Sequence, residues 1–328
     1  MRVLIEVSGE HPSLPRAEAL ATLEGERADV RSVAWTPGLV VLDATGSVER
    51  AIGRLGLAHF VSEEIARGDL DSLRTCARRM DLAGASFRVR VHGLGVDVDP
   101  RPIEEALGAD FGRTGRVDLE SPRIEFRVLV GEEFVLGRVI HRVERSVLEA
   151  SKVARRSFSL PISLHPKFAR ALVNLSRAPT GATVLDPFCG TGGVLLEVSR
   201  LGMRGIGSDL ELPMVRGARR ALRVLKAHSE FAIADAGELP WVSGSIDAIA
   251  TDPPYGRAAS TKGEPPLELY DRALAAFGEV LGRGRCAALV LPTAKAIEVG
   301  ETHLELLEAH PLRVHRSLTR TFCVFRRR

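Results

Sequence analysis

From about residue 161 to the C-terminus, the sequence alternates short apolar runs with helical segments. The apolar runs are Thr183–Leu185, Gly205–Ser208, Phe231–Ala234, Ala248–Thr251 and Cys286–Leu291. This alternation predicts a parallel sheet, because a parallel strand pair needs a long crossover connection, which a helix usually provides. Two later segments, Arg313–Arg316 and Thr321–Phe325, predict a final antiparallel hairpin. The C-terminal half is therefore limited to a doubly wound α/β fold.

The composition predicts a chain of two or three domains with a sizeable core. Hydrophobic residues make up 45% of its 328 residues and charged residues 27%. No apolar run approaches the roughly 20 residues that span a bilayer. The N-terminus reaches an acid at Glu6, so it is a poor signal peptide and is read instead as a first strand. We therefore expect a cytoplasmic protein without a membrane partner.

The cysteines indicate neither a metal centre nor a disulfide scaffold. Cys76, Cys189, Cys286 and Cys323 form no C-x-x-C pair, which argues against a zinc or iron–sulfur site. Four cysteines are also too few to staple a chain of this length. The sequence thus predicts no metal, and it is compatible with a monomer.

Amide side chains are almost absent. The chain has no glutamine, Asn174 is its only asparagine, and arginine outnumbers lysine 40 to 5. Loss of thermolabile amides is typical of proteins from thermophiles. Genomic base composition is the alternative, but a bias toward arginine codons does not remove glutamine. We therefore favour a thermophilic source.

Charge is distributed unevenly around a net value of +3. Residues 1–160 carry a net charge of −2 and residues 161–328 a net charge of +5. Between Arg313 and Arg328 there are six arginines and no acid. Such a tail either binds phosphate or is a solvated terminus, and charge alone does not decide between the two.

The N-terminal half predicts two small α/β units. Residues 1–62 predict a strand, a helix over 15–26 and two strands around the turn T-P-G. A short helix after Ser47 and another strand follow, and together these elements predict a ferredoxin-like arrangement. Residues 63–142 contain the alternating strand S-F-R-V-R-V-H and the segment V-D-L-E-S-P-R-I-E-F-R-V-L-V. These segments resemble the THUMP domain, an RNA-binding module of tRNA-modifying enzymes. Residues 143–160 are basic and predict a partly helical linker to a domain at 161–328.

The motif D-P-P-Y-G at 252–256 follows the apolar strand A-I-A-T. Ligands bind at strand ends in open α/β sheets. An exocyclic amine on a nucleobase is a poor nucleophile, because its lone pair is delocalised into the ring. Hydrogen bonds from the amine to a carboxylate (Asp252) and to a backbone carbonyl (Pro253) would free that lone pair, and Tyr255 could stack on the base. The alternative is an ordinary Pro-Pro turn. The motif resembles the N/D-P-P-Y signature of amino-group methyltransferases.

A second motif, V-L-D-P-F-C-G-T-G-G at 184–193, reads as a strand that ends in an acid and a glycine turn that opens a helix. Glycines allow a ligand to approach the backbone, and a helix N-terminus favours a carboxylate. The dinucleotide pattern G-x-G-x-x-G and a Walker lysine are both absent. The segment resembles motif I of class I methyltransferases. That resemblance implies a cofactor loop containing Asp186, Phe188, Cys189, Gly190, Thr191 and Gly192, with Cys189 as a small pocket residue rather than a nucleophile.

Two further acids stand at strand ends. Asp209 follows Asp186 by 23 residues, a spacing that suits a carboxylate on ribose hydroxyls. By resemblance, Asp235 and Ala236 would contact the adenine. Each acid taken singly is more often a helix cap. His165, in L-H-P-K-F, could line the methionine pocket or serve as a capping or packing residue.

Taken together, the chain resembles the archaeal tRNA (guanine-10) N2-methyltransferases, which are THUMP-containing class I enzymes. The resemblance implies an α/β fold with a Rossmann-like methyltransferase domain, S-adenosylmethionine as cofactor, tRNA as partner, and mono- or dimethylation of guanine. A THUMP methyltransferase acting on guanine 6 or on ribosomal RNA is the alternative. A DNA amino-methyltransferase would lack the THUMP-like unit. A non-catalytic RNA-binding protein with a relict fold is disfavoured, because both motifs are intact.

Overall fold

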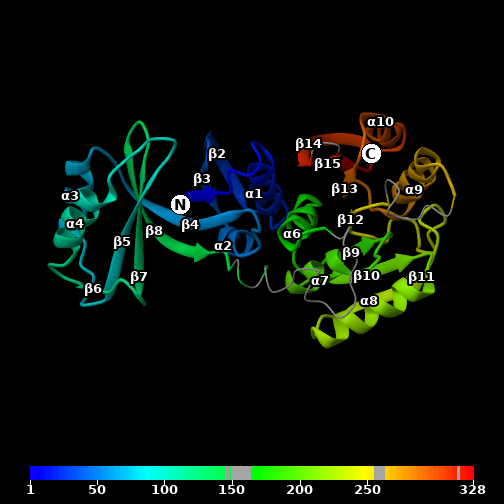
Figure 1. Cartoon of the computed structure of the whole chain (residues 1–328), viewed down its shortest axis with the longest axis horizontal. Coiled ribbons are helices and arrows are strands. Elements are labelled where there is room, and N and C mark those ends of the chain that lie inside the picture. The colour runs from blue at the N-terminus through cyan, green and yellow to red at the C-terminus, as the bar shows by residue number, and fades with distance from the viewer. Residues whose placement is uncertain (145, 147, 149–163, 255–262, 316–317) are drawn as a thin grey trace. The chain divides into compact units, whose positions relative to one another are not determined.

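The computed structural model describes residues 1–144, 146, 148, 164–254, 263–315 and 318–328. The chain divides into two compact units (Figure 1). The first unit comprises residues 1–12, 29–48 and 58–143, and the second comprises 13–28, 49–57 and 144–328. Two segments from the N-terminal part of the sequence therefore belong to the second unit. The four-part division at residues 62, 142 and 160 stays a prediction, and most of the expected linker lies outside the described residues.

The first unit is built on an eight-stranded sheet of order β2-β3-β1-β4-β8-β7-β5-β6. Its strands are β1 (Arg2–Val7), β2 (Asp29–Thr36), β3 (Leu39–Thr45), β4 (Ala58–Gly68), β5 (Ser86–Gly93), β6 (Arg116–Val117), β7 (Ile124–Val130) and β8 (Phe134–Arg142). Strand β4 pairs with both β1 and β8, so the predicted ferredoxin-like and THUMP-like halves share one sheet. Strand β6 is only two residues long and pairs in parallel with the start of β5.

Two helices cover the part of this sheet that contains β4, β5 and β8. They are α3 (Leu70–Arg79) and α4 (Pro100–Phe111), and each begins at an aspartate whose side chain caps the first turn. Phe111 of α4 stacks on Phe126 of β7 with ring centroids 4.1 Å apart. Phe87 contacts both rings edge-on. This aromatic cluster fixes α4 on the sheet.

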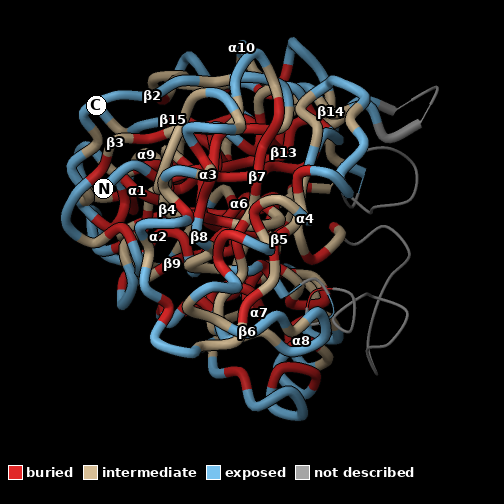
Figure 2. The backbone as a smooth tube through the Cα atoms, turned by 90° about the vertical axis from the view of Figure 1, so that its left-hand side faces the viewer, coloured by how far each residue is buried: buried red, intermediate tan, exposed pale blue. Residues whose placement is uncertain are grey.

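The second unit contains the predicted doubly wound sheet, in the order β11-β10-β9-β12-β13-β15-β14. Its strands are β9 (Thr183–Asp186), β10 (Arg204–Asp209), β11 (Ser229–Ile233), β12 (Ala248–Thr251), β13 (Cys286–Leu291), β14 (Glu305–His315) and β15 (Leu318–Arg326). Neighbours from β11 to β13 pair in parallel, and β14 and β15 form the predicted antiparallel hairpin. Strand β13 is buried at all six residues and appears red in Figure 2. The fold class read from the sequence is thus confirmed.

The final hairpin is longer than the sequence predicted. Strand β14 begins at Glu305 rather than Arg313, and it includes Pro311. A proline cannot donate to a sheet ladder, but β14 is the edge strand and tolerates it. The arginine-rich C-terminus is therefore part of the sheet, and Phe322 and Val324 within it are fully buried.

Helices pack on both faces of the second sheet. They are α6 (Pro166–Leu175), α7 (Gly193–Arg200), α8 (Leu212–Val224), α9 (Pro266–Val280) and α10 (Ala294–His303). Two further helices come from the N-terminal part of the chain, α1 (Leu14–Gly25) and the short α2 (Val48–Ile52). Leu14, Ala17 and Ala21 of α1 share a hydrophobic core with Ala169 and Leu172 of α6. None of the described helices is long and apolar enough to cross a membrane.

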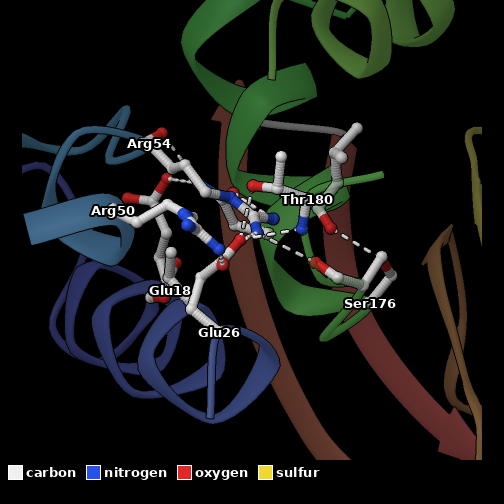
Figure 3. A network of polar contacts seen from close by, with 10 residues as sticks. Glu18, Glu26, Arg50, Arg54, Ser176 and Thr180 are labelled. Carbon is white, nitrogen blue, oxygen red and sulfur yellow. Dashed lines mark hydrogen bonds and ion pairs between the residues drawn. The ribbon is translucent and has the colours of Figure 1, made fainter. Parts of the chain in front are cut away.

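A buried polar network joins α1 and the segment after α2 to α6 (Figure 3). Asn174 donates from its amide nitrogen to Glu18 Oε1 at 2.8 Å and to the Arg54 carbonyl at 3.0 Å. Arg54 in turn donates to Glu26 Oε1 at 2.6 Å. Glu26 also accepts from the Thr180 backbone nitrogen at 2.8 Å and from its hydroxyl at 2.6 Å. The single asparagine of the chain thus lies at the centre of this network.

Candidate active site

Four aspartates lie at one edge of the second sheet. Asp186 and Asp209 are the last residues of β9 and β10, Asp252 directly follows β12, and Asp235 follows β11 by two residues. These four strands are neighbours and parallel, so their carboxyl ends meet at the same edge. Ligands bind at this edge in open α/β sheets. The structure therefore brings together the strand-end acids that the sequence singled out.

The glycine loop between β9 and α7 is held against β10. Gly190 donates its backbone N–H to Asp209 Oδ2 at 3.0 Å, and Cys189 donates to the Ser208 carbonyl at 2.9 Å. Gly190 and Gly192 have φ values of +45° and +77°, in the left-handed region that favours glycine. A Cβ atom on Gly192 would lie 2.7 Å from Leu222 Cδ1. Both backbone conformation and packing thus require a glycine at position 192.

Asp186 connects the two sequence motifs. Its Oδ1 accepts from the Thr251 hydroxyl at 2.7 Å and from the Phe188 backbone nitrogen at 3.3 Å. Thr251 immediately precedes Asp252, so one carboxylate links the glycine loop to the end of β12. Burial raises the pKa of Asp186 to about 7, and the charges of Asp209 and Asp252 add to the rise.

Asp209 and Asp235 both accept backbone N–H groups in the turns that follow their strands. Besides Gly190, Asp209 accepts from the Glu211 backbone nitrogen at 2.9 Å, just before α8. Asp235 accepts from the Gly237 nitrogen at 2.8 Å and from the Arg272 guanidinium at 3.3 Å. Neither acid caps a helix, since the N-cap of α8 is Glu211 and a turn follows Asp235. Their predicted contacts with ribose and adenine stay predictions, as does the role of Ala236, which is buried beside Asp235.

The other expected cofactor residues lie around the same loop. His165 caps α6, where its Nδ1 accepts from the Lys167 backbone nitrogen at 3.3 Å. Phe188 packs against the core that α9 covers, and Thr191 is buried. Cys189 is buried, and burial together with Asp186 and Asp209 raises the pKa of its thiol. A thiol that stays protonated fits the small pocket residue expected there rather than a nucleophile.

Asp252 has a side-chain oxygen that lacks a hydrogen-bond donor in the described part of the chain. Its Oδ1 is buried and has no hydrogen-bond partner among the residues that the structure describes. Its Oδ2 lies 3.9 Å from the Arg320 guanidinium of β15. Burial raises the pKa of Asp252 to about 7, and the Arg320 charge opposes that rise. A buried acceptor without a donor is costly, which indicates that a ligand donor belongs there.

The backbone after Asp252 is fixed from α9. Tyr270 donates its hydroxyl to the Pro254 carbonyl at 2.9 Å. Burial, with the charge of Asp252 as a second cause, raises the pKa of Tyr270 to about 12, so the hydroxyl remains a donor. Pro253 is buried in the same turn. Tyr255, expected to stack on the base, and Gly256 lie outside the described residues.

Sequence reasoning missed three residues of this site: Thr251, Tyr270 and Arg320. Tyr270 could have been noticed, because it is one of only two tyrosines in the chain. Arg320 had no such signal. It reaches Asp252 only because β15 pairs with β13, which pairs in turn with β12.

The glycine loop and the end of β12 offer hydrogen-bonding groups that suit an organic cofactor. The described residues contain no group of three or more His, Cys, Asp or Glu side chains that could hold a metal ion. The glycine loop with its two left-handed residues, the helix that starts at Gly193 and the unpartnered Asp252 Oδ1 instead fit a ligand that brings its own hydrogen-bond donors.

Comparison with known proteins agrees with this geometry. Residues 154–321 match the family described as RMKL-like, methyltransferase domain. The tRNA (guanine(10)-N2)-dimethyltransferase of Methanothermobacter thermautotrophicus is 36% identical, over the whole of both chains. The tRNA (guanine(6)-N2)-methyltransferase of Thermus thermophilus is 33% identical over 86% of each chain.

A solved structure shows the same fold. TrmN from Thermus thermophilus superposes with a TM-score of 0.57 at 25% identity, covering the whole of both chains. The full-length match to the Methanothermobacter enzyme extends through the first unit, the glycine loop and the strand that carries Asp252. The chain therefore belongs to the tRNA (guanine(10)-N2)-dimethyltransferase family of class I methyltransferases.

Proposed function

We propose that this enzyme transfers a methyl group from S-adenosylmethionine to the exocyclic 2-amino group of guanine 10 in tRNA, giving mono- and dimethylguanosine. The buried, unpartnered Oδ1 of Asp252 carries this proposal. A guanine amine has two N–H donors, and it is the partner that such an oxygen lacks. Full-length relatives named as tRNA (guanine(10)-N2)-dimethyltransferases support the same target.

Asp252 would activate the amine by accepting a hydrogen bond from one of its N–H groups. This bond draws the nitrogen away from conjugation with the ring, so its lone pair becomes available for attack. The carboxylate charge then opposes the positive charge that develops on the nitrogen, a stabilisation that a preorganised group provides effectively in a buried site. Tyr270 positions the adjacent backbone by holding the Pro254 carbonyl. The Arg320 charge favours the ionised form of the Asp252 carboxyl, because it opposes the rise in pKa that burial causes.

The glycine loop and the strand-end acids would hold the cofactor. When bound, S-adenosylmethionine supplies an electrophilic methyl group. The backbone of Gly190–Gly192 would lie against its methionine part at the start of α7, and Asp209 and Asp235 would face its ribose and adenine. Calorimetry should detect binding of the cofactor or its demethylated product. Tight binding of NAD with no response to either ligand would contradict this assignment.

Target position is decided by nucleoside analysis. We expect methylated guanosine after incubation of an unmodified tRNA transcript with enzyme and cofactor, and its loss when guanine 10 is replaced by adenine. Methylation at guanine 6 is the second candidate, because the Thermus relative of that name is 33% identical. It predicts loss of product only when guanine 6 is replaced. Absence of methylguanosine from every transcript would refute both.

A further inference from the structure

Helix α8 carries a row of basic side chains on one face. Three arginines follow Arg216 by three, four and seven residues, namely Arg219, Arg220 and Arg223. At this spacing all four lie on the same side of the helix. All four are exposed, as is Lys226 just beyond the helix. The sequence from Leu212 to Ser229 contains no acidic residue. This set, Arg216 to Lys226, is here called the α8 basic face.

The opposite side of α8 is committed to the sheet. Val215, Ala218 and Leu222 are buried there, and the helix packs against β10 and β11 (Figure 1). An amphipathic basic helix that inserts into a membrane needs a free apolar side. Here that side already belongs to the protein core. The basic face therefore points outward on a rigid element.

Within the described ranges, these charges lack the acidic partners that several other exposed arginines of this unit have. Arg285 lies 3.4 Å from Asp247, and Arg326 lies 2.8 Å from Glu305. No such ion pair involves the α8 basic face among the residues that the structure describes. Arg219 instead donates to the Phe231 carbonyl at 3.3 Å and lies 5.8 Å from the ring centroid. The face thus concentrates uncompensated positive charge.

Three of the six C-terminal arginines, which the sequence suggests as a phosphate-binding tail, make contacts within the protein. Arg326 pairs with Glu305, and Arg327 donates to the Glu279 carbonyl at 3.0 Å. Arg320 lies beside Asp252. These three side chains make contacts within the protein, whereas the α8 basic face stays exposed.

We propose that the α8 basic face binds the phosphate backbone of the tRNA substrate, away from the reacting nucleotide. This inference rests on the proposed function, which supplies the polyanion. The helix begins at Leu212, shortly after Asp209, at the same sheet edge as Asp252. Its arginines extend over about 10 Å, since a helix rises about 1.5 Å per residue. Guanidinium groups bind phosphate bidentately, and such contacts hold a nucleic acid without reading its sequence.

The test compares two sets of substitutions. One variant carries Arg216→Gln, Arg219→Gln, Arg220→Gln and Arg223→Gln, which remove charge and preserve helix propensity. The control carries Arg285→Gln and Arg326→Gln, which remove exposed arginines that already have acidic partners. Binding of an unmodified tRNA transcript is measured at several salt concentrations around the physiological value. Calorimetry with the demethylated cofactor reports whether the second unit is folded.

We expect the α8 variant to bind tRNA at least about tenfold more weakly at physiological salt, with a KM for tRNA that rises more than kcat falls. Its plot of log K against log salt should be shallower by about 0.7–0.9 for each phosphate that the variant no longer neutralises. The control should match the wild type in both respects. A shallower slope reports that fewer phosphates are neutralised, which a folding defect would not produce.

Unchanged affinity and slope in the α8 variant, while the wild type methylates tRNA, would overturn this inference and leave the proposed function intact. Weaker binding with an unchanged slope, or an equal loss of affinity in the control, would overturn it as well. A wild type that neither binds nor methylates tRNA would remove the proposed function and this inference together. If a wild type of that kind bound anionic lipid vesicles through α8, the partner of the α8 basic face would be a membrane rather than tRNA.

Discussion

In the proposed mechanism, Asp252 carries a negative charge that opposes the positive charge developing on the amine during methyl transfer. We expect Asp252→Ala to lower the methylation rate by about 100-fold or more, because one preorganised polar group contributes about 2.7–4 kcal/mol to a transition state. Asp252→Asn keeps an oxygen acceptor without the charge and should fall between alanine and wild type. Single-turnover rates test this. Affinity for tRNA should change little, since phosphate contacts dominate it. A near wild-type rate for the alanine variant would assign activation of the amine to another group.

The ionisation of Asp252 predicts a pH dependence. Its pKa is raised to about 7, so the active carboxylate is lost as the pH falls below that value, and kcat/KM for tRNA should fall with it. Removing Arg320 by Arg320→Met takes away the opposing charge and should move the midpoint upward by about one pH unit or more. Arg320→Lys keeps the positive charge, so its midpoint should lie close to the wild-type value.

Two other titrating groups face this carboxylate, Asp186 from β9 and Tyr270 from α9. The pKa of Asp186 is also raised to about 7, so Asp186→Asn is the control for the acid limb of the pH profile. The limb should persist in that variant. An identical midpoint in wild type and Arg320→Met would show that Arg320 does not set the charge of Asp252.

At the scale of elements, the buried polar network that joins α1 to α6 predicts that Arg54 and Arg50 contribute very different amounts to the free energy of unfolding. Arg54 is buried against Glu26 at 2.6 Å, whereas Arg50 reaches the same carboxylate at 3.5 Å from an exposed position. Arg54→Met removes the buried partner of Glu26, which then keeps only the exposed Arg50 as a charged partner, and should cost about 3–5 kcal/mol of unfolding free energy. Arg50→Gln should cost less than about 1 kcal/mol. Chemical denaturation of the full chain compares them, and equal costs would mean that the network adds no stability beyond surface ion pairs.

At the scale of the whole molecule, the structure changes what truncation should do. The sequence suggests that residues 161–328 bind the cofactor after residues 1–142 are deleted. The second unit, however, includes residues 13–28 and 49–57, and α1 covers buried side chains of α6. We therefore expect a 161–328 fragment to aggregate or lose most of its affinity for the demethylated cofactor. Calorimetry and limited proteolysis of the fragment test this, and wild-type affinity would show that α1 and α2 are dispensable.

The sequence by itself determined the elements and the motifs. Periodicity gave the strands that end at Asp186, Asp209 and Asp252, because alternation of strand and helix is a local property of the chain. Parallel neighbours then bring those ends to one edge, so most of the candidate site could be predicted without coordinates. The D-P-P-Y-G motif likewise predicts that Asp252 activates an amine, and this role stays a prediction.

Only the tertiary structure decided which distant residues complete the site and the core. Arg320 reaches Asp252 through two strand pairings, and α1 joins α6 across about 150 residues of sequence. It also showed that Arg320, Arg326 and Arg327 have partners within the protein, whereas the described residues offer the α8 basic face no acidic partner. Such contacts depend on which surfaces are buried together after folding. A pattern of neighbouring residues records the periodicity of one element, but it does not record the partner against which that element packs.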